Sequence, residues 1–269
     1  PVRPARLTMF RTRDRIEIKS ADQLQVMRAA GLVVARTLQR VAEITAPGVT
    51  TAELDDCAAQ SIRDEGATPS FLGYHGFPAH ICVSVNEQVV HGIPGDRYLV
   101  DGDVVSIDCG AIVDGWHGDA ALTVLVGDVA PDLKDLSRVT EESLWAGLRA
   151  ARPGNRLSDI GHAVETVVRS HGDQYGIVEE YVGHGIGSSM HMEPAVPNYG
   201  RPGKGPRLVP GMALAVEPMV VLGDPGVHVL DDDWTVVASD GSHASHWEHT
   251  VADTEDGPWV LTALEDVRL

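Results

Sequence analysis

The sequence predicts an α+β protein made of two similar halves, in which helices cover a shared antiparallel sheet. Three observations lead to this prediction. A set of helix signals occurs twice at one constant offset, each copy precedes a region rich in strand signals, and the middle of the chain carries a strong β-hairpin signal. A cleft between two such halves is a natural place for a ligand.

The first set of helix signals begins at Ser20. Ser20 lies three residues before a glutamine, which is the spacing of a capping box, and apolar residues then recur at helical spacing. A Pro-Gly break at 47–48 separates this helix from a second one. The second helix opens with a capping box formed by Thr50 and Glu53, and Gly66 ends it.

The same signals return in the second half of the chain. The Pro-Gly pair at 47–48 matches the pair at 153–154, and Gly66 matches Gly172, all at an offset of 106 residues. The sequence therefore predicts a second helix pair, related to the first by internal duplication.

Strand signals fill the rest of each half. Runs of β-branched and apolar residues predict strands at 81–90, 104–109, 120–126, 177–182, 212–222, 235–238, 246–253 and 259–262. A Gly- and Pro-rich stretch at 198–211 is typical of a long surface loop. We expect one catalytic domain spanning 18–269, with halves at about 20–126 and 131–262.

The hairpin signal is the pair Asp114-Gly115, because a type I′ turn needs positive φ at both central residues. With the turn there, Gly110 faces Asp119, and Asp108 shares a face with Gly110. The two carboxylates are then diagonal neighbours, which repel each other unless a cation or a proton lies between them. Two interpretations remain open for this segment: solvent-facing aspartates, or the first ligands of a metal site.

The composition excludes several classes of protein. Hydrophobic residues make up 43% and charged residues 22%, as in a globular protein. No apolar run approaches the roughly 18 residues of a membrane helix, and no signal-peptide core follows the Arg-rich start. The three cysteines are widely spaced, which argues against a disulfide framework and favours the reducing cytoplasm.

The net charge of −18 opposes binding to nucleic acid or another polyanion. The exception is a short basic arm at 1–17, which we expect to be a flexible, solvated tail, with weak contact to the ribosome as the alternative. Its basic residues are Arg3, Arg6, Arg11, Arg13 and Arg15.

Three further segments place ligand-type side chains in strand-like surroundings. His184 lies between two glycines, which let other backbone or a ligand approach closely. Glu217 lies within an apolar run, where a carboxylate is rarely buried unless it is paired or binds a metal. Glu248 lies at the start of a predicted strand.

Each of these residues has an ordinary structural interpretation on its own. His184 alone fits a hydrogen-bonded structural histidine, and Glu248 alone fits a solvated strand residue. Together with the two hairpin aspartates, the set suits two divalent ions such as Mn, Fe, Co or a catalytic pair of Zn ions.

Four motifs in this order carry a close resemblance to a known family: "SIDCGAIVDGWHGDAALT", "GHGIG…MHMEP", "AVEPMV" and "WEHTV". From about Ile18 to Thr262, the sequence resembles type I methionine aminopeptidases of peptidase family M24, and the actinobacterial type most of all. The resemblance implies the pita-bread fold of creatinase and these aminopeptidases, which is a curved antiparallel sheet of two pseudo-symmetric halves covered by helices.

The resemblance also implies the chemistry. The enzyme would hydrolytically remove the initiator methionine from nascent proteins when the next residue is small. Two divalent metal ions (Co, Mn, Fe or Zn) would be bound by Asp108, Asp119, His184, Glu217 and Glu248, with Asp119 and Glu248 bridging. A metal-bridging hydroxide would be the nucleophile, and Glu217 its general base.

Two more histidines would act on the substrate in this family. His191 would donate a hydrogen bond to the scissile carbonyl oxygen, and His91 would contact the amide nitrogen after the cut bond. The catalytic residues implied by the resemblance are therefore His91, His191 and Glu217.

A pocket for the methionine side chain is implied as well. A linear thioether suits a narrow apolar slot lined by aromatic rings and sulfur, although ordinary core packing is the alternative for each residue. Met190 and Phe71 depart from residues common in the family, which affects the expected pocket shape. The pocket residues, besides the two histidines, would be Phe71, Tyr74, His75, Phe77, Cys82, Met190 and Trp234.

Two other functions fit the same fold. X-Pro aminopeptidases and dipeptidases usually carry a further N-terminal domain, which a chain of this length does not hold. A catalytically silent binding protein would have lost metal ligands, whereas all five positions are filled here. We therefore expect a cytoplasmic, monomeric metalloaminopeptidase whose partners are nascent polypeptide N-termini, with no membrane or specific nucleic acid partner.

Overall fold

The structure is a computed structural model, and it describes residues 16–269. All five arginines of the predicted basic arm therefore lie outside the described residues. The helices of the described part are α1 (Ala21–Ile44), α2 (Thr51–Asp64), the short 3-10 helix η1 (Tyr74–Gly76), α3 (Pro131–Ala150) and α4 (Leu157–Ser170). Among them, none combines the length and the apolar character needed to cross a membrane.

The first two helices begin where the capping boxes predict. Ser20 Oγ accepts from the Gln23 N–H at 3.3 Å, and the Gln23 side chain accepts from the Ser20 N–H at 2.8 Å. Thr50 and Glu53 make the same reciprocal pair at the start of α2. Both predicted starts are confirmed.

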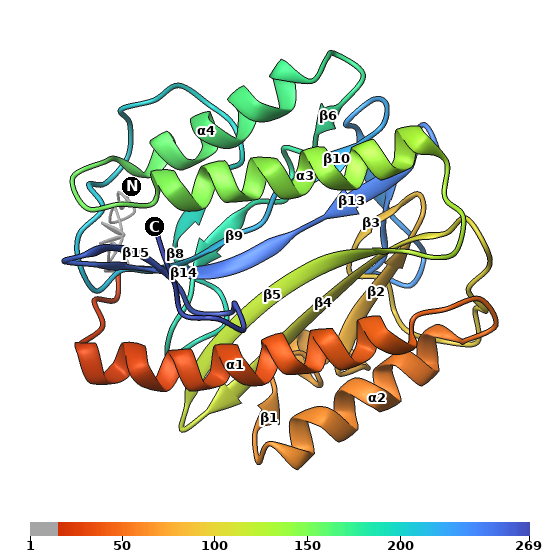
Figure 1. Cartoon of the computed structure of the whole chain (residues 1–269), viewed down its shortest axis with the longest axis horizontal. Coiled ribbons are helices and arrows are strands. Elements are labelled where there is room, and N and C mark those ends of the chain that lie inside the picture. The colour runs from red at the N-terminus through yellow and green to blue at the C-terminus, as the bar shows by residue number, and fades with distance from the viewer. Residues whose placement is uncertain (1–15) are drawn as a thin grey trace, which may run out of the picture.

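The predicted duplication of the helix pair is also confirmed. α2 and α4 begin and end at positions 106 residues apart. The Pro-Gly break before each helix has the same backbone conformation, with φ of +90° at Gly48 and +94° at Gly154. Figure 1 shows α1 and α2 at the bottom of the view, over the first half of the sheet, and α3 and α4 at the top, over the second half.

Strands supply the layer beneath the helices. They are β1 (Thr68–Pro69), β2 (Ile81–Val85), β3 (Gln88–Val90), β4 (Val104–Val113), β5 (Trp116–Leu125), β6 (Gly176–Ile177), β7 (Gly183–Gly185), β8 (Met192–Val196), β9 (Ala213–Val216), β10 (Met219–Val221), β11 (Val227–Val229), β12 (Val236–Ala238), β13 (Ala244–His246), β14 (Glu248–Thr254), β15 (Gly257–Val260) and β16 (Val267–Arg268).

The largest sheet of the described residues has ten strands and joins the two halves. Its main path runs β1-β4-β5-β14-β9-β7-β8, with β2 beside β4 and with β15 and β16 beyond β14. The pairs within it are antiparallel, as predicted. β14 pairs with β5 of the first half and β9 of the second, so a strand from near the end of the chain connects the halves.

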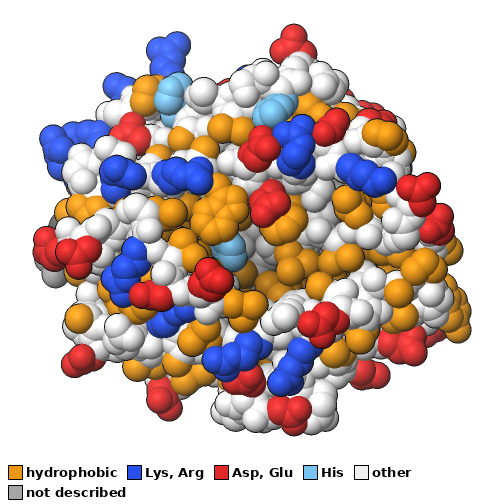
Figure 2. Space-filling view, in the orientation of Figure 1, with side chains coloured by type: hydrophobic (Ala, Val, Ile, Leu, Met, Phe, Trp, Pro, Cys, Tyr) orange, Lys and Arg blue, Asp and Glu red, His pale blue; other side chains and the backbone are white. Residues whose placement is uncertain are grey.

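The two faces of this sheet have different surroundings, because neighbouring residues of a strand point to opposite sides. Ala120 and His249 line a groove of about 710 Å³ beside α1, together with Trp145. Figure 2 shows hydrophobic side chains gathered in the hollow between the helices on this side. Asp119 and Glu248, one residue away from Ala120 and His249 in the chain, line a different cavity.

Some predicted strands are wrong in extent, for local reasons. The strand predicted at 81–90 is two strands, because Asn86 adopts φ of +61° and turns the chain. The strand predicted at 212–222 is interrupted at Glu217-Pro218, where proline has no N–H to donate to a ladder. In the stretch 177–182, only Ile177 is in a strand.

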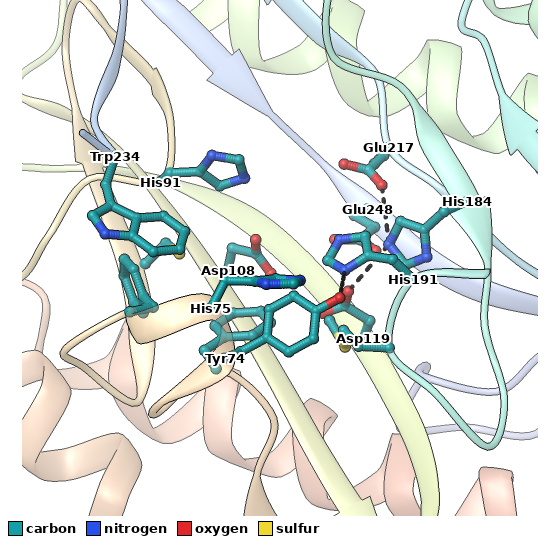
Figure 3. A pocket seen from close by; sticks show the side chains of 14 residues that line it. Tyr74, His75, His91, Asp108, Asp119, His184, His191, Glu217, Trp234 and Glu248 are labelled. Carbon is teal, nitrogen blue, oxygen red and sulfur yellow. Dashed lines mark hydrogen bonds and ion pairs between the residues drawn. The ribbon is translucent and has the colours of Figure 1, made fainter. Parts of the chain in front are cut away.

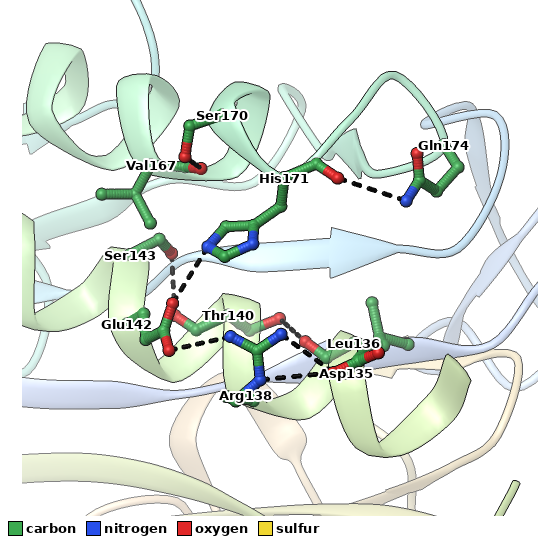
Figure 4. Close-up of polar contacts among 10 residues, drawn as sticks. All are labelled: Asp135, Leu136, Arg138, Thr140, Glu142, Ser143, Val167, Ser170, His171 and Gln174. Atoms are coloured by element: carbon green, nitrogen blue, oxygen red, sulfur yellow. Dashed lines mark hydrogen bonds and ion pairs between the residues drawn. The ribbon is translucent and has the colours of Figure 1, made fainter. Parts of the chain in front are cut away.

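Helices α3 and α4 are also linked by an exposed polar network, shown in Figure 4. Arg138 donates to Asp135 at 2.8 Å and to Glu142 at 2.9 Å within α3. Glu142 also lies 3.0 Å from His171 Nε2 at the end of α4. Exposed pairs of this kind contribute little to stability, so buried apolar packing is the main source of the contact between these helices.

A buried carboxylate away from the main cavity makes the stability of the fold depend on pH. Asp253 on β14 is 2% exposed, and neither of its carboxylate oxygens has a hydrogen-bond partner within residues 16–269. Burial raises the pKa of Asp253 from 3.8 to about 7. Because the folded state binds the proton more tightly than the unfolded state, the destabilisation grows as pH rises above 3.8 and is complete above about 7.

We expect Asp253→Asn to increase the free energy of unfolding, by roughly 2 kcal/mol more at pH 8 than at pH 5. Denaturant titration at the two pH values measures this difference, with the exposed Asp256→Asn as a control. An equal change in the free energy of unfolding at both pH values would mean that ionisation of buried Asp253 does not destabilise the fold.

Candidate active site

The two hairpin aspartates lie as the register predicts. Gly110 pairs with Asp119, and the turn residues Asp114 and Gly115 have φ of +47° and +81°. Asp108 and Asp119 are therefore diagonal neighbours on one face. Asp119 is 3% exposed, so the interpretation of both residues as solvent-facing aspartates is wrong.

Adjacent strands bring the other candidate ligands to the same place. His184 lies on β7, which pairs with β9, and Glu217 follows β9 directly. Glu248 is the first residue of β14 and pairs with Ala121 of β5. Because the sheet order is β4-β5-β14-β9-β7, residues far apart in the sequence converge on one face.

Figure 3 shows these side chains pointing toward one another. His184 Nε2 lies 3.7 Å from Asp119 Oδ2 and 3.5 Å from Glu217 Oε1. One ligand atom each from Asp119, His184 and Glu248 lie within 4.8 Å of one another. Glu248 is 1% exposed, so its interpretation as a solvated strand residue is wrong.

The electrostatics of this cluster are those of a cation site. Burial raises the pKa of Asp108 to about 7. Burial and mutual repulsion raise the pKa values of Asp119, Glu217 and Glu248 well above their ordinary values. One buried oxygen each of Asp108, Asp119 and Glu248 has no hydrogen-bond partner among the residues described.

His184 adds a neutral nitrogen donor to the carboxylate cluster. Burial lowers its pKa to about 3, so its imidazole is neutral, and Nδ1 lies 3.0 Å from the carbonyl oxygen of Gly185. That contact leaves Nε2 facing the carboxylates with its lone pair, which is the arrangement of a metal-ligating histidine. Buried, unpartnered carboxylate oxygens beside a neutral imidazole fit divalent metal ions.

Two more histidines lie beside the cluster. His191 Nδ1 lies 2.9 Å from the hydroxyl oxygen of Tyr74, and the two rings stack at 5.3 Å. His91 has φ of +60°, and its ring packs edge-on against Trp234 at 6.5 Å. Burial lowers the pKa of His91 to about 4 and lowers that of His191 below its ordinary value.

The predicted methionine pocket is an extension of the same cavity, whose volume is about 360 Å³. Phe77 packs edge-on against Phe71 and Trp234, with ring centroids 6.5 and 5.1 Å apart. Cys82 and Met190 are 5% and 2% exposed, so the slot is apolar and contains sulfur. The cavity is lined by all fourteen predicted residues: Phe71, Tyr74, His75, Phe77, Cys82, His91, Asp108, Asp119, His184, Met190, His191, Glu217, Trp234 and Glu248.

One residue of the cluster was missed in the sequence. His246 is 1% exposed, and its Nε2 lies 3.8 Å from Glu217 Oε2. It stands two residues before Glu248, and alternation along a strand could have placed both on one face. The strand predicted at 246–253 contains both residues, although the structure divides it at Trp247 into β13 and β14.

Comparison with known proteins assigns the chain and its fold to a class of peptidases. Residues 25–255 match metallopeptidase family M24, so the chain belongs to that family. The prolidase of Pyrococcus furiosus shares the pita-bread fold, with a TM-score of 0.74 at 21% identity over 92% of this chain and 66% of that one.

More similar proteins show which group of family M24 the chain belongs to. Methionine aminopeptidase 1 of Mycobacterium tuberculosis is 53% identical over 261 residues, which cover 95% of this chain and 98% of that protein. Methionine aminopeptidase 1 of Bacillus subtilis is 52% identical over 246 residues, 91% of this chain and 98% of that protein. The crystal structure of the Thermotoga maritima methionine aminopeptidase matches with a TM-score of 0.90 at 41% identity, covering 93% and 100% of the two chains. Within family M24, the chain belongs to the type I methionine aminopeptidases, as its motifs predict.

Proposed function

We propose that this protein hydrolyses the first peptide bond of nascent polypeptides and releases the N-terminal methionine when the next residue is small. The observation that carries the proposal is the single cavity that joins a cluster of buried, unpartnered carboxylates to an apolar slot containing sulfur. The relatives named methionine aminopeptidase support the same reaction.

The metal centre of the proposal is dinuclear. The residues that would hold two divalent ions are Asp108, Asp119, His184, Glu217 and Glu248. The ions, which we propose to be Co, Mn, Fe or Zn, would supply Lewis acidity that activates a water molecule and polarises the scissile carbonyl.

Glu217 is the proposed general base. Its carboxylate lies between His184 and His246 and lines the cavity where the peptide bond would be cut. A carboxylate oxygen of Glu217 takes a proton from the attacking water and passes it to the leaving amine.

His191 and His91 are proposed to bind the two sides of the scissile bond. When the Tyr74 hydroxyl donates to His191 Nδ1, the ring proton is on Nε2, which can donate to the carbonyl oxygen as negative charge develops there. His91 lines the same cavity and would contact the amide nitrogen after the cut bond.

The slot formed by Phe71, Tyr74, His75, Phe77, Cys82, Met190 and Trp234 is proposed to bind the methionine side chain. Its aromatic edges and sulfur atoms match a linear thioether, and they exclude water from it.

We also propose that residues 18–269 act as one catalytic domain with halves at about 20–126 and 131–262, because the main sheet includes strands from both. We propose that the protein acts as a monomer, because one chain supplies all five proposed metal ligands and the adjoining slot. We further propose that the protein is located in the cytoplasm. The positive charge of the basic arm at 1–17 supports a weak contact with the ribosome.

The test is a panel of short peptides given to the metal-loaded protein. We expect release of methionine from Met-Ala-Ser, and at least about 100-fold slower release from a Met-Lys peptide. The reason is that a long side chain must be accommodated beside His91 and Glu217 in a cavity of about 360 Å³. An N-acetylated Met-Ala-Ser, which lacks a free amine, should not be cut. Cleavage of Ala-Pro-Ser in preference to Met-Ala-Ser would instead indicate an X-Pro aminopeptidase.

A further inference from the structure

His246 is held rigidly beside the carboxylate cluster. It ends β13, where it pairs with Met219 of β10. Its N–H lies 3.1 Å from Ser106 Oγ and 3.2 Å from Thr123 Oγ1, and its carbonyl oxygen accepts from Thr123 Oγ1 at 2.9 Å. The backbone at this position is therefore fixed by buried polar contacts.

The imidazole of His246 is directed into the cluster without a partner. Nε2 is buried and makes no hydrogen bond to any residue in the range 16–269. The carboxylate oxygen Oε2 of Glu217 lies 3.8 Å from Nε2, which is too far for a hydrogen bond. Because an unpartnered buried nitrogen costs free energy, this geometry favours a ligand between the imidazole and the carboxylates.

The carboxylates around His246 form a second possible metal site. One ligand atom each from Glu217, His246 and Glu248 lie within 4.8 Å of one another. The same holds for Asp119, His184 and Glu248. The cluster thus contains two groups, each with one imidazole, that share Glu248.

We propose that His246 Nε2 is a sixth protein ligand of the metal centre, and that it binds one ion together with Glu217 and Glu248. Asp108, Asp119, His184, Glu217 and Glu248 would remain the other five protein ligands of the two ions. This inference rests on the proposed function, because it assumes that two divalent ions occupy the cavity. With two histidine nitrogens, the centre should favour Co and Zn over Mn more strongly than a centre with one histidine does.

The first test compares metal binding by the wild type, His246→Gln and His249→Gln. His249 is a matched control, because it is a half-buried histidine directly after Glu248. Its Nδ1 lies 2.8 Å from Thr262 Oγ1, and its side chain lines the groove on the other face of the sheet. We expect His246→Gln to weaken binding of Co and Zn at one of the two sites about tenfold or more, while Mn affinity changes less than about threefold. His249→Gln should bind all three metals as the wild type does.

The second test is spectroscopic and does not depend on activity. In Co-loaded His246→Cys, a thiolate ligand should add a sulfur-to-cobalt charge-transfer band that the wild type and His249→Cys lack. Unchanged Co and Zn affinity in His246→Gln, or no new band in folded, Co-loaded His246→Cys, would overturn the sixth ligand. In that case a wild type that still binds two ions and releases methionine would leave the proposed function intact. A wild type that binds no divalent ion would overturn both.

Discussion

Removal of divalent ions is expected to abolish the release of methionine from Met-Ala-Ser. The cavity contains four carboxylates whose pKa values are raised by burial, and three of them carry a buried oxygen without a partner in the described structure. The thiol of Cys82 does not replace the metal-activated water, because burial and the nearby aspartates raise its pKa well above the ordinary value and keep it protonated. We therefore expect no measurable turnover after exhaustive dialysis against EDTA.

The measurement follows methionine release before chelation, after chelation, and after addition of Co, Mn, Fe or Zn in turn. A sample treated with EDTA already saturated with calcium controls for effects of the chelator itself. Turnover that survives with no residual metal would mean that the nucleophile is not activated by a bound ion.

Replacement of His191 by alanine has the second-largest expected effect. His191 lies against the cluster, with its ring centroid 4.2 Å from that of His184, and its Nδ1 is held by the hydroxyl of Tyr74. As the proposed donor to the developing oxyanion, its loss should lower kcat about 100- to 1000-fold. The metal content should stay at the wild-type value, because His191 is assigned to the substrate and not to the ions.

The measurement combines steady-state kinetics on Met-Ala-Ser with elemental analysis of the purified variant. His91→Ala is a useful comparison, because it removes the other substrate-facing imidazole and should also keep the metals. Loss of an ion from His191→Ala would show that this histidine is a ligand.

Local signals predicted much of the fold. The capping box at Ser20 defines the start of α1, and the Asp114-Gly115 turn defines the register that places Asp108 diagonal to Asp119. These features depend on residues only a few positions apart, where side-chain chemistry determines backbone geometry directly.

Long-range features could not be predicted in this way. No local pattern shows that β14 pairs with both β5 and β9, although this pairing brings Glu248 to the hairpin. Strand periodicity also missed the interruption at Pro218 and the position of His246. Nine of the fourteen lining residues were predicted only from the resemblance to a known family, and the five proposed metal ligands were also candidates from their own surroundings. His246 was singled out by neither route, and its place beside Glu217 needed the structure.

The position of β14 has a consequence for biosynthesis. Glu248 comes from near the C-terminal end of the chain, and its strand joins the two halves of the sheet. A growing chain that has not yet emerged past β14 lacks Glu248, which we propose as a bridging metal ligand, and the strand that joins its two halves. The enzyme can therefore gain activity only after β14 has been synthesised, which is after every other proposed metal ligand, so a shorter nascent copy cannot process its neighbours.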